Sequence, residues 1–520
     1  MIPFYFCPKL FFMYDAIIIG SGFGGTMTAR QLVRAGKKVL MIERGDWVVR
    51  RPENWDLRGS VDLTEHYDKT SPLRVEKGGH KKVMGLYASV GGPSVFYGGV
   101  SFRFRAGDFE KNPAIAGDSG AEWPITYDDL EPFYSEAEQI LRISGEAGTD
   151  PTEPPRSAPY PQGAPPLAGI SEKVKSAAES LGLHPFQLPL AINYSDTSRP
   201  TCQHCTTCDT FACAISAKND LATLVIPALI GQGMDLKTNM VVTQLNAKNG
   251  HIERVTAQDK KTGDTHVFRG RQVVLSAGAL GSPHILLSSG LDEHNPGGAT
   301  IGRYLMRHVN TIIFGIFPGA ADKEGRFHKQ LAILDYYWGH PDIKGPAGKL
   351  GSLQQMPTPP PGLVQNEVPG ILGKWLSQGV RLLTGLLAIA EDQPQFGNFI
   401  RIDPHQKDRF GMPQPVIRHT YSARDKAAVG ALVRPAKKIL SRAGAVAHYV
   451  HPIRTFSHAV GTVRMGNDPK TSALDAFCRF RGIENLFVVD GSFMPTSAAL
   501  NPSLTISANA LRVGEHIARL

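Results

Sequence analysis

The first regular pattern along the chain is a buried strand, a helix and a second buried strand. Residues 14–19 form a short apolar run without alternation, which is typical of a strand covered on both faces. Residues 26–35 form a helical stretch that Gly36 closes, and residues 38–42 form a second apolar run. Because a helix between two such strands implies parallel pairing, this unit predicts an α/β sheet.

Similar units recur in the middle and at the end of the chain. Residues 271–276 predict a strand, residues 277–283 a turn, and residues 284–289 a helix with Pro283 in its first turn. Residues 485–490 predict a further buried strand, and residues 505–520 a final helix. We therefore predict an α/β fold with one discontinuous, Rossmann-like domain.

The intervening segments have a different character. Residues 150–166 are rich in proline and predict an extended surface connection. Residues 309–454 contain alternating stretches such as residues 311–317, which predict an α+β domain built on an antiparallel sheet. Residues 370–388 form the most apolar helical candidate, either a lid or membrane-surface helix or, in our preferred interpretation, a helix packed on this domain.

These patterns divide the chain into two predicted domains. The first binds a dinucleotide, and the second binds the substrate and includes the cysteine-rich segment 202–213. The predicted boundaries are residues 13–110, 232–308 and 455–520 for the first domain, and residues 111–231 and 309–454 for the second.

Composition and charge exclude several classes of protein. Of the 520 residues, 42% are apolar and 20% are charged, which is ordinary for a globular protein and excludes a disordered chain. The net charge is +9, but the Lys and Arg residues alternate with Asp and Glu instead of forming a basic patch, so we expect no nucleic-acid partner. No apolar run reaches the ~20 residues that span a bilayer, so we expect a soluble, cytoplasmic protein. Residues 1–12 are expected to be a loose tail or to precede the true start at Met13.

A glycine fingerprint follows the first predicted strand. Gly20 suits a tight turn, Gly22 allows a pyrophosphate to approach the backbone, and Gly25 allows close packing of helix and strand. Glu43 ends the second strand, 18 positions beyond Gly25, where a carboxylate can accept hydrogen bonds from a ribose. The pattern predicts a site for NAD or FAD, and no second fingerprint accompanies it.

A second glycine-rich loop, VGGPSVFYGG, covers residues 90–99. Four glycines in ten residues suit a backbone pressed against a flat ring system. With the fingerprint, this loop and residues 123–130, 278–290, 457–462 and 489–502, nearly the whole chain resembles the glucose–methanol–choline (GMC) oxidoreductases. The resemblance implies an FAD-dependent alcohol oxidase or dehydrogenase.

The resemblance also implies roles for individual residues. His458 matches the active-site histidine beside the flavin, and Asn501 matches the second active-site position. Phe96 stands where some members attach FAD through a histidine, so we predict non-covalent FAD. The remaining residues expected to bind the cofactor are Ser21, Gly91, Gly92, Ser94, Val242, Ala277 and Asp490, the last near the ribityl phosphate.

The chemistry of these two side chains fits alcohol oxidation. A neutral imidazole at His458 can accept the hydroxyl proton, and the Asn501 amide can stabilise the developing alkoxide. We expect a small-molecule alcohol as substrate and dioxygen or an external acceptor such as a quinone as oxidant. Two alternatives remain: a hydroxynitrile lyase with redox-silent FAD, and a non-enzymatic electron-transfer flavoprotein.

Four of the six cysteines lie within twelve residues, at Cys202, Cys205, Cys208 and Cys213. Such clustering favours a reducing compartment over a secreted disulfide framework. The spacing resembles the ferredoxin pattern but has four residues before the last cysteine and no following proline. The segment is therefore a candidate for an iron–sulfur cluster or zinc, with structural thiols as the alternative.

Overall fold

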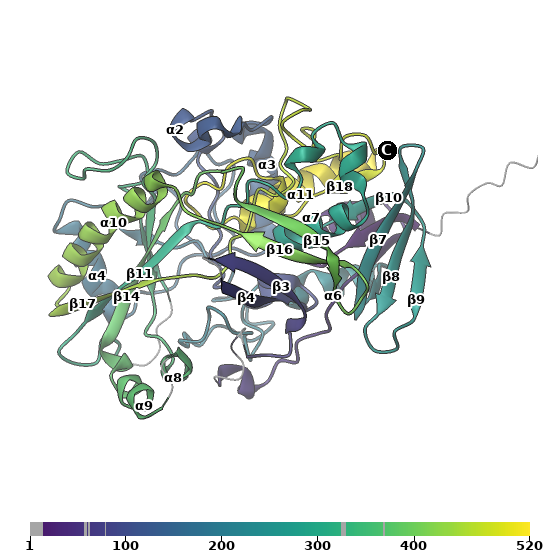
Figure 1. The fold of residues 1–520 in the computed structure, drawn as a ribbon. Helices are drawn as coiled ribbons and strands as arrows, with labels where there is room; N and C mark the ends of the chain where they lie inside the picture. The colour runs from purple at the N-terminus through teal and green to yellow at the C-terminus, as the bar shows by residue number, and fades with distance from the viewer. Residues whose placement is uncertain (1–13, 57–59, 61–62, 78–79, 324–328, 368–369) are drawn as a thin grey trace, which may run out of the picture.

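A five-stranded parallel sheet gathers strands from distant parts of the chain. The computed structural model describes all residues except 1–13, 57–59, 61–62, 78–79, 324–328 and 368–369. Most of the strand residues are buried, as expected for a parallel sheet. The strand order is β18 (Leu486–Val488), β10 (Gly270–Leu275), β1 (Tyr14–Ile19), β2 (Val39–Ile42) and β6 (Asp235–Lys237) (Figure 1).

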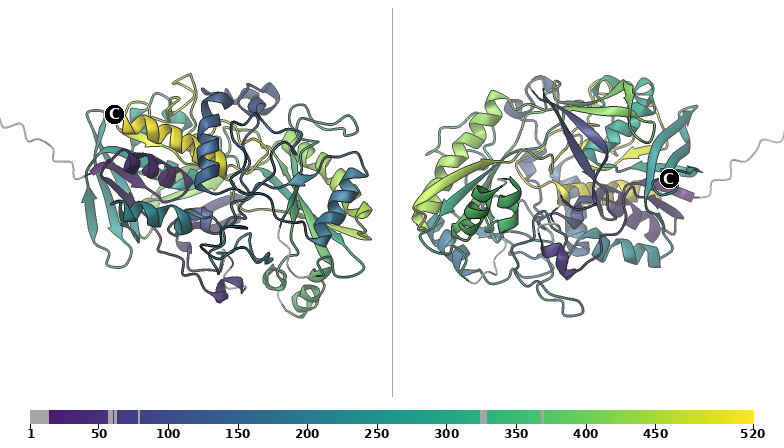
Figure 2. Two further views of the ribbon diagram at one scale, coloured as in Figure 1. Left: turned by 180° about the vertical axis from the view of Figure 1, so that it is seen from behind. Right: turned by 60° about the horizontal axis from the view of Figure 1, so that its bottom comes forward.

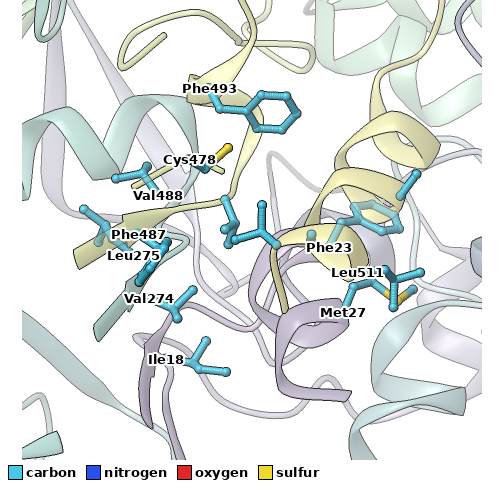
Figure 3. Packing of buried hydrophobic residues seen from close by; sticks show 14 of the residues in the cluster. Ile18, Phe23, Met27, Val274, Leu275, Cys478, Phe487, Val488, Phe493 and Leu511 are labelled. Atoms are coloured by element: carbon cyan, nitrogen blue, oxygen red, sulfur yellow. The ribbon is translucent and has the colours of Figure 1, made fainter. Parts of the chain in front are cut away.

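Three helices pack against one another beside this sheet. Helix α1 (Phe23–Arg34) lies against α11 (Ser503–Ala518), which also contacts α3 (Tyr127–Ile140) (Figure 2, left). Figure 3 shows the resulting core, in which Ile18 and Val274 of the sheet face Met27 and Leu511 of the helices. The discontinuous Rossmann-like fold predicted from the sequence is thus observed.

Two small sheets flank the parallel sheet. A three-stranded antiparallel sheet contacts β2 and β10. A four-stranded sheet pairs β3 with β16, so it joins an early segment to a late one in the middle of the molecule (Figure 1). The first consists of β7 (Met240–Lys248), β8 (His251–Asp259) and β9 (Thr265–Phe268); the second of β15 (Phe399–Lys407), β16 (Pro413–Arg418), β3 (Tyr67–Lys77) and β4 (His80–Tyr87).

The second large layer is a six-stranded antiparallel sheet, as predicted for residues 309–454. Helix α10 (Ala423–Arg442) covers this sheet and α4 (Gly169–Glu179) packs beside α10. The strand order is β17 (Ala447–Pro452), β11 (Val309–Ile316), β14 (Leu383–Ala390), β13 (Ser352–Met356), β12 (Leu331–Ile333) and β5 (Phe186–Gln187). The shorter helices are α2 (Pro113–Ala116), α5 (Leu221–Leu224), α6 (Ile226–Gly231) and α8 (Pro361–Glu367).

The prediction of one helix over residues 370–388 is wrong. The α-helix α9 covers only Ile371–Gln378. After a 3-10 turn at Val380–Leu382 the chain enters β14, which pairs with β11 on one side and β13 on the other. Residues 384–390 are all buried, so the strand carries a continuous apolar run that resembles a buried helix in sequence.

A smaller correction concerns the turn predicted at residues 277–283. Helix α7 already begins at Gly278 and runs to Ser288, with Pro283 inside it. The glycine-rich sequence is therefore the first turn of the helix rather than a loop before it.

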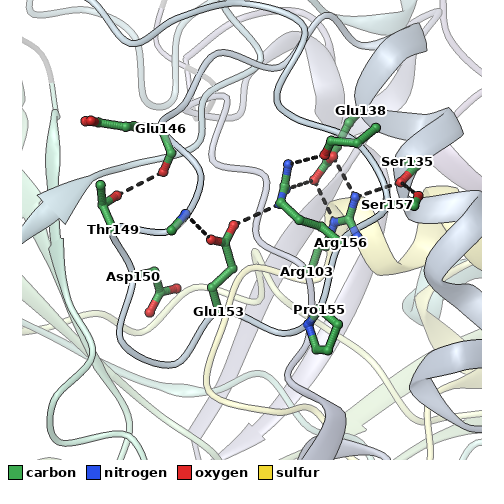
Figure 4. Close-up of polar contacts among 12 residues, drawn as sticks. Arg103, Ser135, Glu138, Glu146, Thr149, Asp150, Glu153, Pro155, Arg156 and Ser157 are labelled. Carbon is green, nitrogen blue, oxygen red and sulfur yellow. Dashed lines mark hydrogen bonds and ion pairs between the residues drawn. The ribbon is translucent and has the colours of Figure 1, made fainter.

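A buried network of charges fixes the proline-rich connection to the core (Figure 4). Arg103 makes two hydrogen bonds of 2.8 Å to Glu138, and Glu138 also accepts a bond of 2.9 Å from Arg156 of the connection. Arg156 in turn pairs with Glu153 at 2.9 Å. The segment has no helix or strand, as predicted, but it is anchored by ion pairs.

Two further expectations concern the chain as a whole. Within the part of the chain that the structure describes, no helix has both the length and the apolar character needed to cross a bilayer. The expectation for residues 1–12 lies outside the described residues. The predicted domain boundaries and the cytoplasmic location stay predictions.

Candidate active site

The glycine fingerprint forms an open cradle at the start of α1. Gly22 precedes the helix without a side-chain cap, and the first turn holds no acidic residue. By contrast, Thr126 and Ser422 cap α3 and α10 with their side chains. The free amide groups and the helix dipole make the α1 terminus suited to a phosphate group.

The glycines of the fingerprint differ in the space around them. A Cβ atom at Gly25 would lie 2.1 Å from the carbonyl oxygen of Gly20, so this glycine allows α1 to pack on β1. A Cβ atom at Gly22 would meet only Pro93 Cδ, at 4.0 Å. Gly20 itself has φ of +98°, a left-handed conformation that glycine adopts readily. Gly22 therefore faces open space, whereas Gly25 is required by packing.

Glu43 and Ser21 form a hydrogen-bonded pair at the floor of this cradle. The Glu43 carboxylate accepts bonds from Ser21 N at 3.0 Å, Ser21 Oγ at 2.6 Å and Gly45 N at 2.8 Å. Burial raises the pKa of Glu43, although these hydrogen bonds oppose the shift. The pair holds the carboxylate at the carboxyl end of β2, where the fingerprint places the ribose partner.

The second glycine-rich loop closes on the first. Gly91 N donates to Ser21 Oγ at 2.9 Å, and Gly91 and Gly92 have φ of +86° and +54°. Ser94 Oγ donates to Gly91 O at 2.7 Å and accepts from Leu221 N at 3.2 Å. Ser21, Gly91 and Ser94 thus lie in one hydrogen-bonded cluster, in which Ser94 shapes the loop, and their role in cofactor binding stays a prediction.

Asp490 ties the end of β18 to the beginning of α7. Its carboxylate accepts hydrogen bonds from Gly278 N at 3.0 Å and Ser492 N at 2.9 Å, and from the Ser282 hydroxyl. Burial raises the pKa of Asp490. Ala277 N donates to Ser282 Oγ at 3.1 Å, so Ala277 and Asp490 belong to one cluster.

The remaining cofactor candidate, Val242, is buried in β7, two residues after Met240, whose amide donates to the carbonyl oxygen of Glu43 at 3.0 Å. Val242 therefore lies on a strand that is bonded to the end of β2.

Two buried hydroxyls in this region have no hydrogen-bond partner within the described structure. They belong to Ser89, which adjoins the glycine-rich loop, and Ser276, which adjoins the first turn of α7. Buried polar groups normally find partners. The unsatisfied hydroxyls, the uncapped helix and the open face of Gly22 together fit a polar, phosphate-bearing dinucleotide such as FAD.

The predicted catalytic pair comes together next to this cradle. His458 Nε2 lies 3.5 Å from Asn501 Nδ2, although the residues are 43 positions apart. The segment after His458 packs on the cofactor cluster, since Gly461 N donates to Gly491 O at 3.1 Å. Gln354 Nε2 donates to Asn501 Oδ1 at 2.8 Å and so turns the Asn501 NH₂ group toward His458.

His308 is a site residue that the sequence analysis missed. Its Nδ1 atom lies 3.0 Å from His458 Nδ1, and the two rings cross at 80°. Its Nε2 atom lies 2.9 Å from the carbonyl oxygen of Ser497. No motif marks His308 in the sequence; it reaches His458 across 150 positions through the start of β11.

Buried carboxylates hold the backbone around these histidines. Asp392 accepts from His308 N at 3.0 Å, and Glu391 accepts from Ala498 N at 2.8 Å. Lys349 pairs with Glu391 at 2.7 Å, so the carboxylate charge is balanced within the protein. These contacts fix both chain segments that carry the site.

The surroundings of His458 favour its neutral form. Burial, together with the neighbouring His308 and Lys329, lowers its pKa to about 3. A neutral imidazole keeps a lone pair that can accept a proton at neutral pH.

The four clustered cysteines line a separate cavity behind the glycine-rich loop. The Lys218 ammonium group donates to Val95 O at 3.3 Å and to Cys208 O at 2.8 Å, which joins the two segments. Among the described residues, no group of three or more Cys, His, Asp or Glu side chains is arranged to hold a metal ion. The iron–sulfur or zinc assignment stays a prediction.

Comparison with known proteins identifies the class that this fold and site define. The family described as GMC oxidoreductase matches residues 14–310 with its N-terminal part and residues 394–510 with its C-terminal part. The chain belongs to this family, as the motifs indicated. It is an FAD-dependent oxidoreductase of the alcohol oxidase and dehydrogenase class.

Individual relatives support this assignment over nearly the full chain. Paromamine 6'-oxidase of Streptomyces fradiae is 30% identical, covering 97% of this chain and 91% of its own length. The 2-methyl-1,2-propanediol dehydrogenase of Mycolicibacterium austroafricanum is 28% identical, covering 97% and 95%. The crystal structure of pyridoxine 4-oxidase from Mesorbium loti has the same fold, with a TM-score of 0.69, 18% identity and coverage of 96% and 98%.

Proposed function

We propose that this protein oxidises a primary or secondary alcohol to a carbonyl compound, with His458 as general base and Asn501 stabilising the alkoxide. The observation that carries the proposal is the contact between His458 Nε2 and Asn501 Nδ2, 3.5 Å apart, beside the dinucleotide cradle. A base and a hydrogen-bond donor at this separation can share one substrate oxygen.

Two residues act on the substrate hydroxyl group, one as proton acceptor and one as hydrogen-bond donor. His458 Nε2 accepts the proton as the O–H bond breaks, and its low pKa keeps it unprotonated beforehand. Asn501 Nδ2 donates to the oxygen as negative charge develops on it. Gln354 holds the Asn501 amide in the orientation that this requires.

FAD, when bound, supplies the acceptor for the hydride that leaves the same carbon. We assign its pyrophosphate to the amide groups around Gly22, its adenosine ribose to Glu43 and its ring system to the loop of Gly91 and Gly92. Non-covalent binding is supported by Phe96, whose buried side chain packs with Val95 and Ala212 and has no atom able to form the bond.

The substrate and the final electron acceptor are open parts of the proposal. Paromamine and 2-methyl-1,2-propanediol are the first alcohols to screen because relatives named for them are 30% and 28% identical to this chain. Dioxygen and a quinone-like acceptor are the two candidates for reoxidation. The cysteine cavity is tested separately by iron, zinc and sulfide analysis of the purified protein.

Anaerobic addition of alcohols to the FAD-loaded protein tests the proposed reaction. We expect the flavin absorbance to bleach with at least one alcohol and the matching carbonyl product to appear in equal amount. A flavin that stays oxidised while a cyanohydrin is cleaved would instead identify a lyase. A flavin that no alcohol reduces, in a protein that remains fully functional with His458→Ala, would identify an electron-transfer protein.

A further inference from the structure

One row of hydrogen bonds links the proposed base to a backbone carbonyl group. The row begins at Ser497 O, passes through both nitrogens of His308 and both nitrogens of His458, and ends at Asn501. Its separations are 2.9, 3.0 and 3.5 Å. Each imidazole therefore uses its two nitrogens for two different partners.

The carbonyl end sets the direction of the whole row. A carbonyl oxygen can only accept a hydrogen bond, so His308 Nε2 must carry a proton. In a neutral ring the other nitrogen then holds a lone pair, and His308 Nδ1 accepts. It follows that His458 Nδ1 carries the proton and that His458 Nε2 holds the lone pair.

The opposite end of the row requires the same direction. Gln354 Nε2 donates to Asn501 Oδ1, which leaves Asn501 Nδ2 as the group facing His458 Nε2. An amide NH₂ group only donates, so its partner nitrogen must be the unprotonated one. With the amide groups of Gln354 and Asn501 in these orientations, both ends agree on a lone pair on His458 Nε2.

We propose that His308 is a positioning residue that fixes the tautomer of His458, so that Nε2 is the nitrogen free to accept the substrate proton. This inference rests on the proposed function, because it concerns how the same base is prepared. It adds a residue outside the motifs on which the resemblance to the family was based. His308 acts only through His458 and touches no substrate atom in this account.

The structure fixes His308 as firmly as this role requires. Its side chain is buried, and its backbone has φ of +60°, an uncommon conformation for a residue other than glycine. Its amide donates to Asp392 at 3.0 Å, and its carbonyl oxygen accepts from Tyr421 OH at 2.7 Å. In the described structure both backbone groups and both ring nitrogens of His308 are hydrogen-bonded, so a flip of the ring would break the bonds to His458 and Ser497.

The direction of these hydrogen bonds also limits where the proton accepted by His458 can go. Once the substrate O–H bond breaks and the N–H bond forms at His458 Nε2, His458 carries a proton on both nitrogens. Its Nδ1 proton can be shared with His308 Nδ1, but the row ends at a carbonyl oxygen that has no proton to exchange. The proton therefore stays on the imidazole pair, next to the site, until it leaves by another route.

Two substitutions separate tautomer control from simple packing. In His308→Asn, the Oδ1 atom takes the place of Nδ1 and still accepts from His458, whereas His308→Phe keeps the ring and removes the acceptor. We expect His308→Phe to lower the limiting rate of flavin reduction about 10- to 100-fold, as expected for one lost buried partner. His308→Asn should stay within about threefold of the wild type, since it keeps that partner.

A matched control comes from another buried histidine. His284 Nε2 lies 2.7 Å from the carbonyl oxygen of Pro413, so His284→Phe loses a comparable bond to a carbonyl group. Equal slowing by His284→Phe and His308→Phe would overturn the inference, because general destabilisation would then account for both. Unchanged reduction in His308→Phe would also overturn it.

A spectroscopic measurement on the wild-type protein decides the matter without activity. Nitrogen-15 spectra of histidine-labelled, FAD-loaded protein report which ring nitrogen of His458 carries the proton, with a His458→Gln sample identifying the signals. We expect a proton on Nδ1 and none on Nε2; the reverse would refute the inference even if His308→Phe failed to fold. If His458→Gln reduced flavin as fast as the wild type, the proposed function itself would fail, whatever His308 does.

Discussion

Replacing Gly22 with alanine should separate cofactor binding from folding. A Cβ atom at this position meets only Pro93 Cδ, at 4.0 Å, and the Gly22 φ of −70° is accessible to alanine. The fold should therefore tolerate the methyl group, and the less flexible unfolded chain should leave stability unchanged or raised by about 0.4–1 kcal/mol. The new methyl group instead fills the space that we assign to the FAD pyrophosphate.

The loss of one hydrogen bond to a charged group corresponds to about 1.5–3 kcal/mol. FAD affinity should accordingly fall about 10- to 100-fold. Flavin fluorescence titration of the apoprotein gives the affinity, and urea unfolding of the same apoprotein gives the stability. A Gly22→Ala variant that binds FAD as tightly as the wild type would refute our placement of the cofactor.

Gly25→Ala is the matched control in the same motif. Its Cβ atom would lie 2.1 Å from Gly20 O, so α1 must move away from β1. Overpacking of this kind costs about 1–3 kcal/mol or more, and we expect a lower unfolding midpoint for the apoprotein. The two variants should thus fail in different assays, Gly22→Ala in cofactor binding and Gly25→Ala in folding.

Three further predictions follow from the polar groups. The pKa of His458 is about 3 in the folded protein and near 6.5 in the unfolded chain, so the unfolded chain binds more protons between these pH values. The contribution of His458 to the free energy of unfolding should therefore fall as the pH drops from 6.5 toward 3. For the same reason, kcat/KM should show no histidine-like loss between pH 8 and 5. Arg103→Met removes two hydrogen bonds from the buried Glu138 carboxylate, which keeps its bond to Arg156, and should cost about 1–3 kcal/mol in urea unfolding, against under about 1 kcal/mol for Arg34→Met at an exposed pair. Burial raises the pKa of Cys202 to about 12, so iodoacetamide should alkylate this thiol much more slowly at pH 8 in the folded protein than in urea. A break in kcat/KM near pH 6.5 would contradict the low pKa of His458. Equal losses of stability in the two arginine variants would contradict the buried pairing of Glu138, and equal alkylation rates in the folded and unfolded protein would contradict the burial of Cys202.

The sequence predicted those parts of the fold that depend on local patterns. Residues 14–19 and 39–42 form buried strands because their apolar runs fit a sheet covered on both faces, and Gly25 marks the close approach of helix and strand. The family motifs pointed to His458 and Asn501, which lie side by side in the structure although 43 positions separate them, and their catalytic roles stay a prediction.

The errors and omissions arise where distant segments decide the structure. Residues 383–390 carry an apolar run that a buried helix could also carry, and pairing with β11 and β13 selects the strand. His308 has no motif, and its importance depends on the Ser497 carbonyl group, 189 positions away. Asp490 and Ser94 were assigned to cofactor binding, whereas the structure shows that their polar atoms also organise the surrounding turns.

The most direct test of the central claim is the rate of flavin reduction by alcohol in a single turnover, measured for the wild type and for His458→Asn. With the strongest alcohol found in the anaerobic screen, stopped-flow absorbance should show bleaching that is about 10²–10⁴-fold slower in the variant, the usual contribution of a general base. The variant should remain yellow, since we assign FAD binding to other residues. Reduction at the same rate in both proteins would contradict the account.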